Sequence, residues 1–97
     1  MTRDETLTIL RDHSDEIRTR FGVKRLAVFG SMARDEAGEQ SDVDVLVEFQ
    51  GDPTFDGYWD VKEYLEELLN REVDLVTDDA VRPQLRPYIE RDLVDVA

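Results

Sequence analysis

Two aspartates, Asp42 and Asp44, lie on either side of a single valine at the start of a mostly apolar segment. Side chains alternate along a β-strand, so both carboxylates would point to one face while Val43, Val45 and Val47 point to the other. Two neighbouring carboxylates repel each other unless a cation lies between them. Carboxylate oxygens suit Mg²⁺ or Mn²⁺, which also bind substrate phosphates. The pair therefore indicates a metal site, and a solvated strand face in an Asp-rich chain is the alternative.

A glycine and a serine, Gly30 and Ser31, follow an apolar segment that predicts a buried strand. A glycine at the end of a strand lets the backbone approach a phosphate closely, and the amides at the start of the next helix point at the anion. Ser31 can add a hydroxyl to this cradle. Arg34, one turn further on, can reach phosphate oxygens, or it can pair with Asp35 or Glu36. A Gly-Ser pair is by itself a weak signal.

A third aspartate, Asp74, lies between Val73 and Leu75 in another apolar segment. Burying a lone carboxylate costs several kcal/mol, so we expect a metal ion or a polar partner there. If this strand lies beside that of Asp44, the carboxylates converge at one end of a sheet. Such a triad is typical of active sites that use two metal ions for phosphoryl or nucleotidyl transfer. In this hypothesis Asp42 and Asp44 ligate both ions, while Asp74 ligates the first and is the candidate acceptor of the attacking hydroxyl's proton.

These residues would be positioned by an alternating order of helices and strands. A capping pattern at residues 2–5 and helical apolar spacing predict a first helix that Gly22 ends. The predicted elements are a helix over 2–20, a strand over 24–29, a short helix over 32–37 closed by Gly38, a strand over 42–49, a helix over 56–70 and a strand over 71–77. Pro83 and Pro87 limit the tail to a short helix, and residues 93–96 are a candidate edge strand.

Three further side chains have a predicted environment. His13 falls off the apolar stripe of the first helix, so we expect it to face solvent and assign it no chemistry. Tyr58 shares its helical stripe with Val61 and Leu65, which places it near the core. Trp59 falls off that stripe and is a candidate for contact with a partner or for the wall of a base pocket.

The length of 97 residues predicts one domain over 1–97 with a single modest core, too small to include a separate substrate-recognition domain. The chain has no cysteine, which excludes a disulfide framework and a thiolate metal site. Its N-terminus is charged, and its apolar segments are too short to span a membrane. We therefore expect a soluble cytoplasmic protein without membrane contact.

Acidic residues outnumber basic ones by 24 to 12, which gives a net charge of −12. So negative a chain repels phosphates, and no direct binding to nucleic acid is expected. Two explanations of the acidity stay open. One is a solvated surface suited to a high-salt cytoplasm, where screening weakens self-repulsion, and the other is docking on a basic partner protein.

Taken together, the motifs resemble those of the minimal nucleotidyltransferases in the DNA polymerase β superfamily. Their signature is a hydrophobic strand, Gly-Ser, a short helix with an arginine, Ser-Asp-x-Asp and a later hydrophobic-Asp-hydrophobic strand. In this chain the corresponding segments are Val28-Phe29-Gly30-Ser31, Ala33-Arg34, Ser41-Asp42-Val43-Asp44 and Val73-Asp74-Leu75. The resemblance implies the α/β (α+β) fold of that superfamily, a small mixed β-sheet with helices on one face, similar to the polymerase β palm.

The resemblance also implies how the site works. ATP would be the substrate, and two Mg²⁺ or Mn²⁺ ions would assist the transfer. The residues that would bind the nucleotide triphosphate are Gly30, Ser31, Arg34 and Ser41. The residues that would act as catalytic groups and metal ligands are Asp42, Asp44 and Asp74.

Minimal nucleotidyltransferases of this size are commonly encoded beside a small helical HEPN protein, often an RNase, and resemble the antitoxin half of that toxin-antitoxin pair. Some transfer AMP from ATP to a tyrosine of the toxin, so the resemblance implies a HEPN-type toxin as partner. Two other functions stay open. One is a non-catalytic antitoxin that masks its partner by binding. The other is a small-molecule nucleotidyltransferase, a kind of enzyme that usually carries an additional helical domain.

The chain departs from the family pattern at two positions. Many relatives carry a second basic residue where Met32 stands, and a glycine where Asp35 stands. Loss of the basic residue weakens the triphosphate clamp, and Met32 is expected to pack instead. Asp35, Glu36 and Glu39 add negative charge near the phosphate site, which disfavours ATP unless metal is bound.

Overall fold

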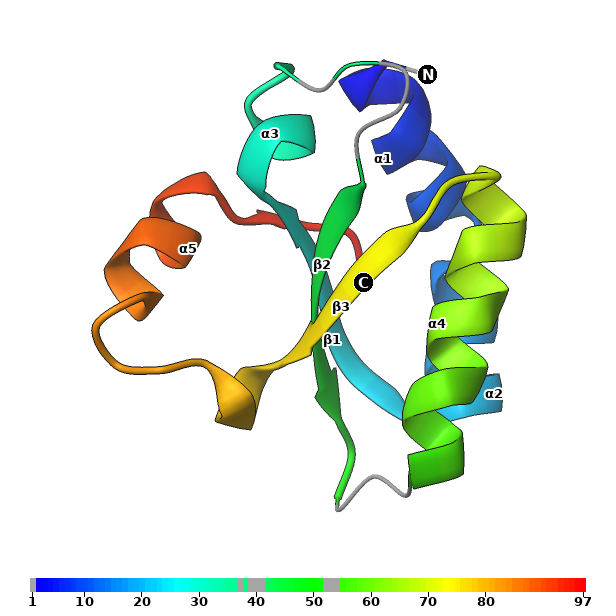
Figure 1. The fold of residues 1–97 in the computed structure, drawn as a ribbon. Helices are drawn as coiled ribbons and strands as arrows, with labels where there is room; N and C mark the ends of the chain where they lie inside the picture. The colour runs from blue at the N-terminus through cyan, green and yellow to red at the C-terminus, as the bar shows by residue number, and fades with distance from the viewer. Residues whose placement is uncertain (1, 37, 39–41, 52–54) are drawn as a thin grey trace.

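The computed structural model describes residues 2–36, 38, 42–51 and 55–97, which form a mixed sheet flanked by helices (Figure 1). Along the chain the elements are α1 (Arg3–Asp12), α2 (Ser14–Phe21), β1 (Val23–Phe29), α3 (Gly30–Ala33), β2 (Val43–Phe49), α4 (Phe55–Leu69), β3 (Val73–Thr77), the 3₁₀ turn η1 (Asp78–Ala80), α5 (Arg86–Asp92) and β4 (Val94–Asp95). The predicted order is confirmed, including the short helix and the edge strand of the tail, except that two helices stand where the sequence predicts one at the start of the chain and that η1 is not predicted.

The first predicted helix is two helices, because the hydrogen bonding changes at His13. The His13 amide donates to the Leu10 carbonyl oxygen at 3.2 Å, and the Ile9 carbonyl oxygen lies 2.8 Å from Nδ1 of the imidazole. The prediction of one uninterrupted helix over 2–20 is therefore wrong, and His13 is half-buried rather than facing solvent. The capping pattern is confirmed, since the side chains of Thr2 and Glu5 each accept a hydrogen bond from the other residue's amide.

The short helix α3 begins two residues before the predicted range of 32–37 and ends at Ala33. Asp35 has a backbone φ of 60°, and this left-handed conformation stops a right-handed helix. Glycine adopts such a φ without strain, so the aspartate at this position is strained where a glycine would not be. The predicted end of the helix at Ala37 lies outside the described residues.

The sheet has the strand order β3-β2-β1-β4. β1 is antiparallel to both β2 and β4, whereas β2 and β3 are parallel, so the sheet is mixed as predicted. Two pairings position the site. Asp44 in β2 is the partner of Asp74 in β3 on one side and of Phe29 in β1 on the other. The chain turns into α3 immediately after Phe29.

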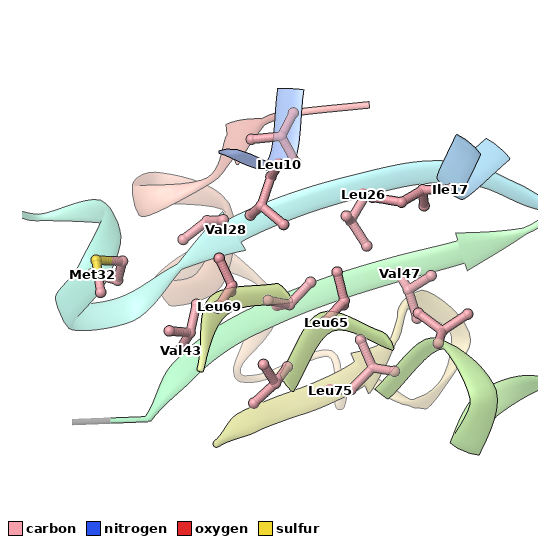
Figure 2. Close-up of a cluster of buried hydrophobic side chains, with 14 of the residues drawn as sticks. Leu10, Ile17, Leu26, Val28, Met32, Val43, Val47, Leu65, Leu69 and Leu75 are labelled. Atoms are coloured by element: carbon pink, nitrogen blue, oxygen red, sulfur yellow. The ribbon is translucent and has the colours of Figure 1, made fainter. Parts of the chain in front are cut away.

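The core lies between one face of the sheet and the helices α1, α2 and α4 (Figure 2). Alternate side chains of β2 are fully buried on this face, as the period-two pattern predicts: Val43, Val45 and Val47. The inward stripe of α4 is also fully buried and has four-residue spacing: Val61, Leu65 and Leu69. Burial of each such side chain stabilises the fold by roughly 1.5–3 kcal/mol, which fixes the opposite orientation of Asp44 and its alternating neighbours.

Figure 1 shows α1, α2 and α4 on one side of the sheet and α5 on the other. The expectation of helices on one face holds for the helices that build the core. The helix α5 instead packs against β1 and α3, and none of its residues, all of them described, belongs to the core cluster. Within the described ranges, no helix combines the length and apolar character needed to cross a membrane.

Candidate active site

The parallel pairing of β2 and β3 places Asp44 beside Asp74 on the sheet face opposite the core. Neighbouring strands lie about 4.8 Å apart, so the side chains of an in-register pair are direct neighbours. Asp42 comes immediately before β2, two residues from Asp44, and the period of two gives it the same face. The predicted adjacency of the two strands is confirmed, and it brings the three aspartates to one end of the sheet.

The environment of Asp44 shows that these carboxylates interact. Burial raises the pKa of Asp44 most, followed by the negative charges of Asp74 and Asp42. A hydrogen bond with Asp74 adds to the rise, and the positive charge of Arg34 opposes it. A cation among the carboxylates would relieve this repulsion, which is the physical basis for a metal site here.

The side chains do not form a closed metal-binding cluster in this conformation. Over residues 2–36, 38, 42–51 and 55–97, no three Asp, Glu, His or Cys side chains are close enough to hold one ion together. Asp42 and Asp74 are exposed, and Asp44 is half-buried. The prediction that Asp74 is buried is wrong, because β3 is an edge strand whose alternate side chains face away from the core. An exposed carboxylate keeps its hydration, so Asp74 alone does not require a metal.

Gly30, the first residue of α3, is packed directly against Asp44. Its φ is 71°, in the left-handed region that favours glycine. A Cβ atom at this position would lie 3.1 Å from Cγ of Asp44 and closer still to Oδ2. Ser31 follows in α3 and is half-buried. The structure thus packs the predicted glycine turn against Asp44, and any larger residue at position 30 would have to displace the Asp44 carboxylate.

Arg34 lies just after α3 and forms two ion pairs. Its Nε donates to Oε2 of Glu36 at 2.9 Å, and its Nη1 donates to Oδ2 of Asp92 at 2.8 Å. The hydrogen bond to Glu36, and then that to Asp92, raises the pKa of Arg34 and keeps it charged. The contact with Glu36 is an alternative that the sequence leaves open. The contact with Asp92 spans 58 residues, and no sequence pattern indicates it.

Sequence reasoning also misses Lys62 and Glu66, which bind the backbone at the start of β3. The Lys62 ammonium donates to the Val73 carbonyl at 2.7 Å and to Oε2 of Glu66 at 2.8 Å, while that same oxygen accepts from the Val73 amide at 3.0 Å. β3 is an edge strand, so these bonds satisfy backbone groups that have no strand partner. These bonds fix the backbone position of Val73, the residue before Asp74. The i,i+4 spacing predicts only the pair between the two side chains.

Two other sequence-based predictions concern the phosphate cradle. Met32 is 1% exposed and accepts a hydrogen bond on its sulfur from the Thr6 hydroxyl at 3.5 Å. The expectation that Met32 packs in the core is confirmed. Ser41, the other predicted nucleotide-binding residue, lies outside the described residues, so its role stays a prediction.

The two neighbouring aromatics at the start of α4 have different environments. Tyr58 packs against the core, and its hydroxyl donates to the Leu75 carbonyl oxygen, as its stripe position predicts. Trp59 is 42% exposed, and its ring meets that of Tyr58 edge-on at 5.7 Å between centroids. The exposure of Trp59 leaves its suggested contact with a partner a prediction.

A mixed sheet with a glycine turn packed against in-register aspartates defines a class: enzymes that transfer nucleotidyl groups on a palm-like sheet. Within that class, residues 10–96 match the sequence family of the nucleotidyltransferase domain, and the chain belongs to this family. It is therefore a transferase, and the family and fold predicted from sequence are confirmed.

The matched proteins are similar to this chain over most of their own length. The chain is 42% identical over 96 residues to the protein adenylyltransferase MntA of Thermococcus cleftensis, covering 99% of this chain and 97% of that protein. A solved structure described as a minimal nucleotidyltransferase has a TM-score of 0.82 at 38% identity and covers 97% of this chain and 95% of that chain. A Shewanella oneidensis complex of a tri-AMPylated HEPN toxin with an MNT antitoxin contains the same fold, with a TM-score of 0.67 at 15% identity over 94% of this chain and 71% of that chain.

Proposed function

We propose that the chain is a metal-dependent adenylyltransferase that acts as an antitoxin by transferring AMP from ATP to a tyrosine of a HEPN-type RNase toxin. The relative from Thermococcus cleftensis is named a protein adenylyltransferase, and the Shewanella complex pairs an MNT antitoxin with an AMPylated HEPN toxin. Both names support the proposal by similarity. The proposal includes a single domain over 1–97, a cytoplasmic location and no direct binding to nucleic acid or membrane.

The observation that carries the proposal is the registry of Asp44 with Asp74 against the Gly30 turn. The oxygen donors of these aspartates and of Asp42 suit two Mg²⁺ or Mn²⁺ ions. Burial raises the pKa of Asp44 most, and a bound cation would relieve the repulsion by Asp74 and Asp42 that adds to this rise. When bound, the ions would neutralise charge on the triphosphate and lower the pKa of the attacking hydroxyl. Asp42 is exposed, so its side chain is free to turn toward Asp44 on loading.

The chemical step is a displacement at the α-phosphorus of ATP. The tyrosine oxygen forms a bond to this phosphorus, the bond to the oxygen that bridges to the β-phosphate breaks, and pyrophosphate leaves. The proton of the tyrosine hydroxyl passes to Asp74, whose exposed carboxylate lies at the open edge of the sheet. AMP is then esterified to the acceptor, and no oxidant or reductant is needed.

The triphosphate would be held at the turn into α3. Gly30 lets the backbone approach, and Ser31 and Ser41 add hydroxyls. Arg34 adds a positive charge close enough to Asp44 to oppose part of the rise in its pKa. The ion pair of Arg34 with Glu36 offsets part of the extra negative charge at this end of the sheet.

A second candidate function, masking of the toxin without catalysis, is favoured by the net charge of −12, which suits a basic partner. Intact-mass analysis of a co-purified partner separates the two functions. AMP adducts that depend on ATP and divalent cation support the transferase, whereas a stable complex without a change in mass supports masking.

Substitution of the site residues completes this experiment. The double variant Asp42→Asn, Asp44→Asn should bind the partner and add no AMP. The matched control is Asp12→Asn, Asp15→Asn, which removes the same charge from exposed positions of α1 and α2 and should transfer normally. Normal transfer by the Asp42, Asp44 variant would sink the proposed site.

A further inference from the structure

The C-terminal helix α5 ends at an aspartate that is almost enclosed. The side chain of Asp92 is 13% exposed, and its Oδ2 accepts the hydrogen bond from Nη1 of Arg34 at 2.8 Å. Its other oxygen, Oδ1, lies 3.8 Å from Nε of Arg91. The helices α5 and α3 contact each other, and Figure 1 shows α5 on the side of the sheet away from α4.

An aspartate is electrostatically disfavoured at this position. The C-terminal end of a helix carries partial negative charge, and the protein as a whole has a net charge of −12. The positive charge of Arg34 compensates for both effects. The contact is therefore a specific match between the end of α5 and the arginine that follows α3.

Among the residues that the structure describes, the two ion pairs of Arg34 use only part of its guanidinium. Arg34 has five N–H donors, of which Nε is directed to Glu36 and one on Nη1 to Asp92. The side chain of Arg34 is 41% exposed, so further donors can reach a ligand. Two carboxylates on different segments hold this planar group in one orientation next to the aspartate site.

We propose that Asp92 is a positioning residue for nucleotide binding: it orients the Arg34 guanidinium toward the triphosphate without contacting the nucleotide itself. The C-terminal helix thereby becomes part of the nucleotide site. This inference rests on the proposed function, because it needs ATP to bind at the turn into α3.

The chain offers a matched control in the Arg25–Asp95 pair. Nε of Arg25 donates to Oδ1 of Asp95 at 2.7 Å, which ties β4 to β1 three residues beyond Asp92. Both contacts are hydrogen-bonded Arg–Asp pairs that anchor the C-terminal segment. Only the Asp92 pair involves the candidate phosphate-binding arginine.

The test measures the affinity of the whole chain for a non-hydrolysable ATP analogue with Mg²⁺ by calorimetry, together with steady-state transfer. Asp92→Asn should weaken binding by about three- to tenfold, whereas Asp95→Asn should leave it unchanged. The KM for ATP should rise in Asp92→Asn with little change in kcat. Asp92→Glu keeps the charge and should bind more tightly than Asp92→Asn, which provides a second variant if Asp92→Asn fails to fold.

Non-additivity separates positioning from a general structural effect. Arg34→Ala should weaken binding at least as much as Asp92→Asn, and combining the two should add little, because Asp92 acts through Arg34. Equal affinities in Asp92→Asn and wild type, tighter binding in Asp92→Asn, or additive losses would each overturn the inference. If wild type binds and transfers, such a result leaves the proposed function intact. If wild type binds no nucleotide, the proposed function and this inference both fail.

Discussion

Replacing Gly30 by alanine tests the contact that defines the site. Gly30 has a φ of 71°, and a Cβ atom there would lie 3.1 Å from Cγ of Asp44 and closer to Oδ2. An L-residue in the left-handed region costs roughly 1–2 kcal/mol. The new methyl group also forces the carboxylate away, and an off-rotamer side chain costs about 0.5–1.5 kcal/mol. We therefore expect Gly30→Ala to lower the free energy of unfolding by roughly 1.5–3.5 kcal/mol, the sum of these two costs.

Gly22 provides the control, because it has nearly the same backbone conformation without the collision. Its φ is 66°, and a Cβ atom there would meet nothing within 4 Å. Gly22→Ala should therefore show only the backbone cost of roughly 1–2 kcal/mol. The difference between the two alanine variants, measured by urea denaturation, isolates the contact with Asp44.

A second background removes the collision partner. Cβ of Asp44 lies 3.4 Å from the position of the added methyl, an ordinary contact, so truncation to Asp44→Ala leaves room. In that background Gly30→Ala should cost no more than Gly22→Ala. In the otherwise wild-type chain, Gly30→Ala should abolish AMP transfer by displacing the carboxylate, while Gly22→Ala retains it. Equal destabilisation by both variants, with transfer intact in Gly30→Ala, would refute the reasoning.

Three further predictions concern charge and backbone strain. The ion pair with Lys62, and then the hydrogen bond from the Val73 amide, lowers the pKa of Glu66. The ionised Glu66 therefore stabilises the fold at any pH above the ordinary pKa of glutamate, and this stabilisation is lost as the pH falls through the lowered pKa. Urea denaturation should show Glu66→Gln about 1–2 kcal/mol less stable at pH 7 and equal to wild type in strong acid; a gap that does not change with pH would contradict this. The pKa of Asp44 is raised, so ionisation destabilises the fold as the pH rises, and Asp44→Asn should be more stable than wild type at neutral pH in EDTA but not in acid. A less stable Asn variant in EDTA would contradict that sign. Asp35→Gly relieves the strain of the φ of 60° at the entropic cost of glycine, so the free energy of unfolding should rise by roughly 0–1 kcal/mol. Calorimetry should also show tighter ATP binding, because a negative charge is removed. Clear destabilisation would argue against strain at this residue.

Most of the fold could be predicted from the periodic spacing of apolar residues, because the core is built from these local patterns. The alternation around Val45 and the stripe through Leu65 each require one orientation of their element, and both side chains are fully buried as predicted. The break at His13 could not be predicted, since it depends on one imidazole replacing the backbone donor to the Ile9 carbonyl. The amphipathic pattern is nearly the same on both sides of that break.

The parts of the site that consist of neighbouring residues in the sequence could be predicted. The spacing of Asp42 and Asp44, and the glycine before α3, specify which groups face each other once the strands pair. The exposure of Asp74 depends on the edge position of β3, which is a property of strand order rather than of local sequence. The pair between Arg34 and Asp92 depends on where α5 packs, and a single sequence contains no signal for it.

Labelled ATP tests the central claim most directly. The wild-type chain, the proposed HEPN-type partner and Mg²⁺ are incubated with ATP that carries the radiolabel on either the α- or the γ-phosphate, and the label on the partner is measured. Transfer of AMP predicts label on the partner from α-labelled ATP only, with none from γ-labelled ATP and none for Asp44→Asn. Label from the γ-phosphate, or no label from either form while the partner is still neutralised, would contradict nucleotidyl transfer at this site.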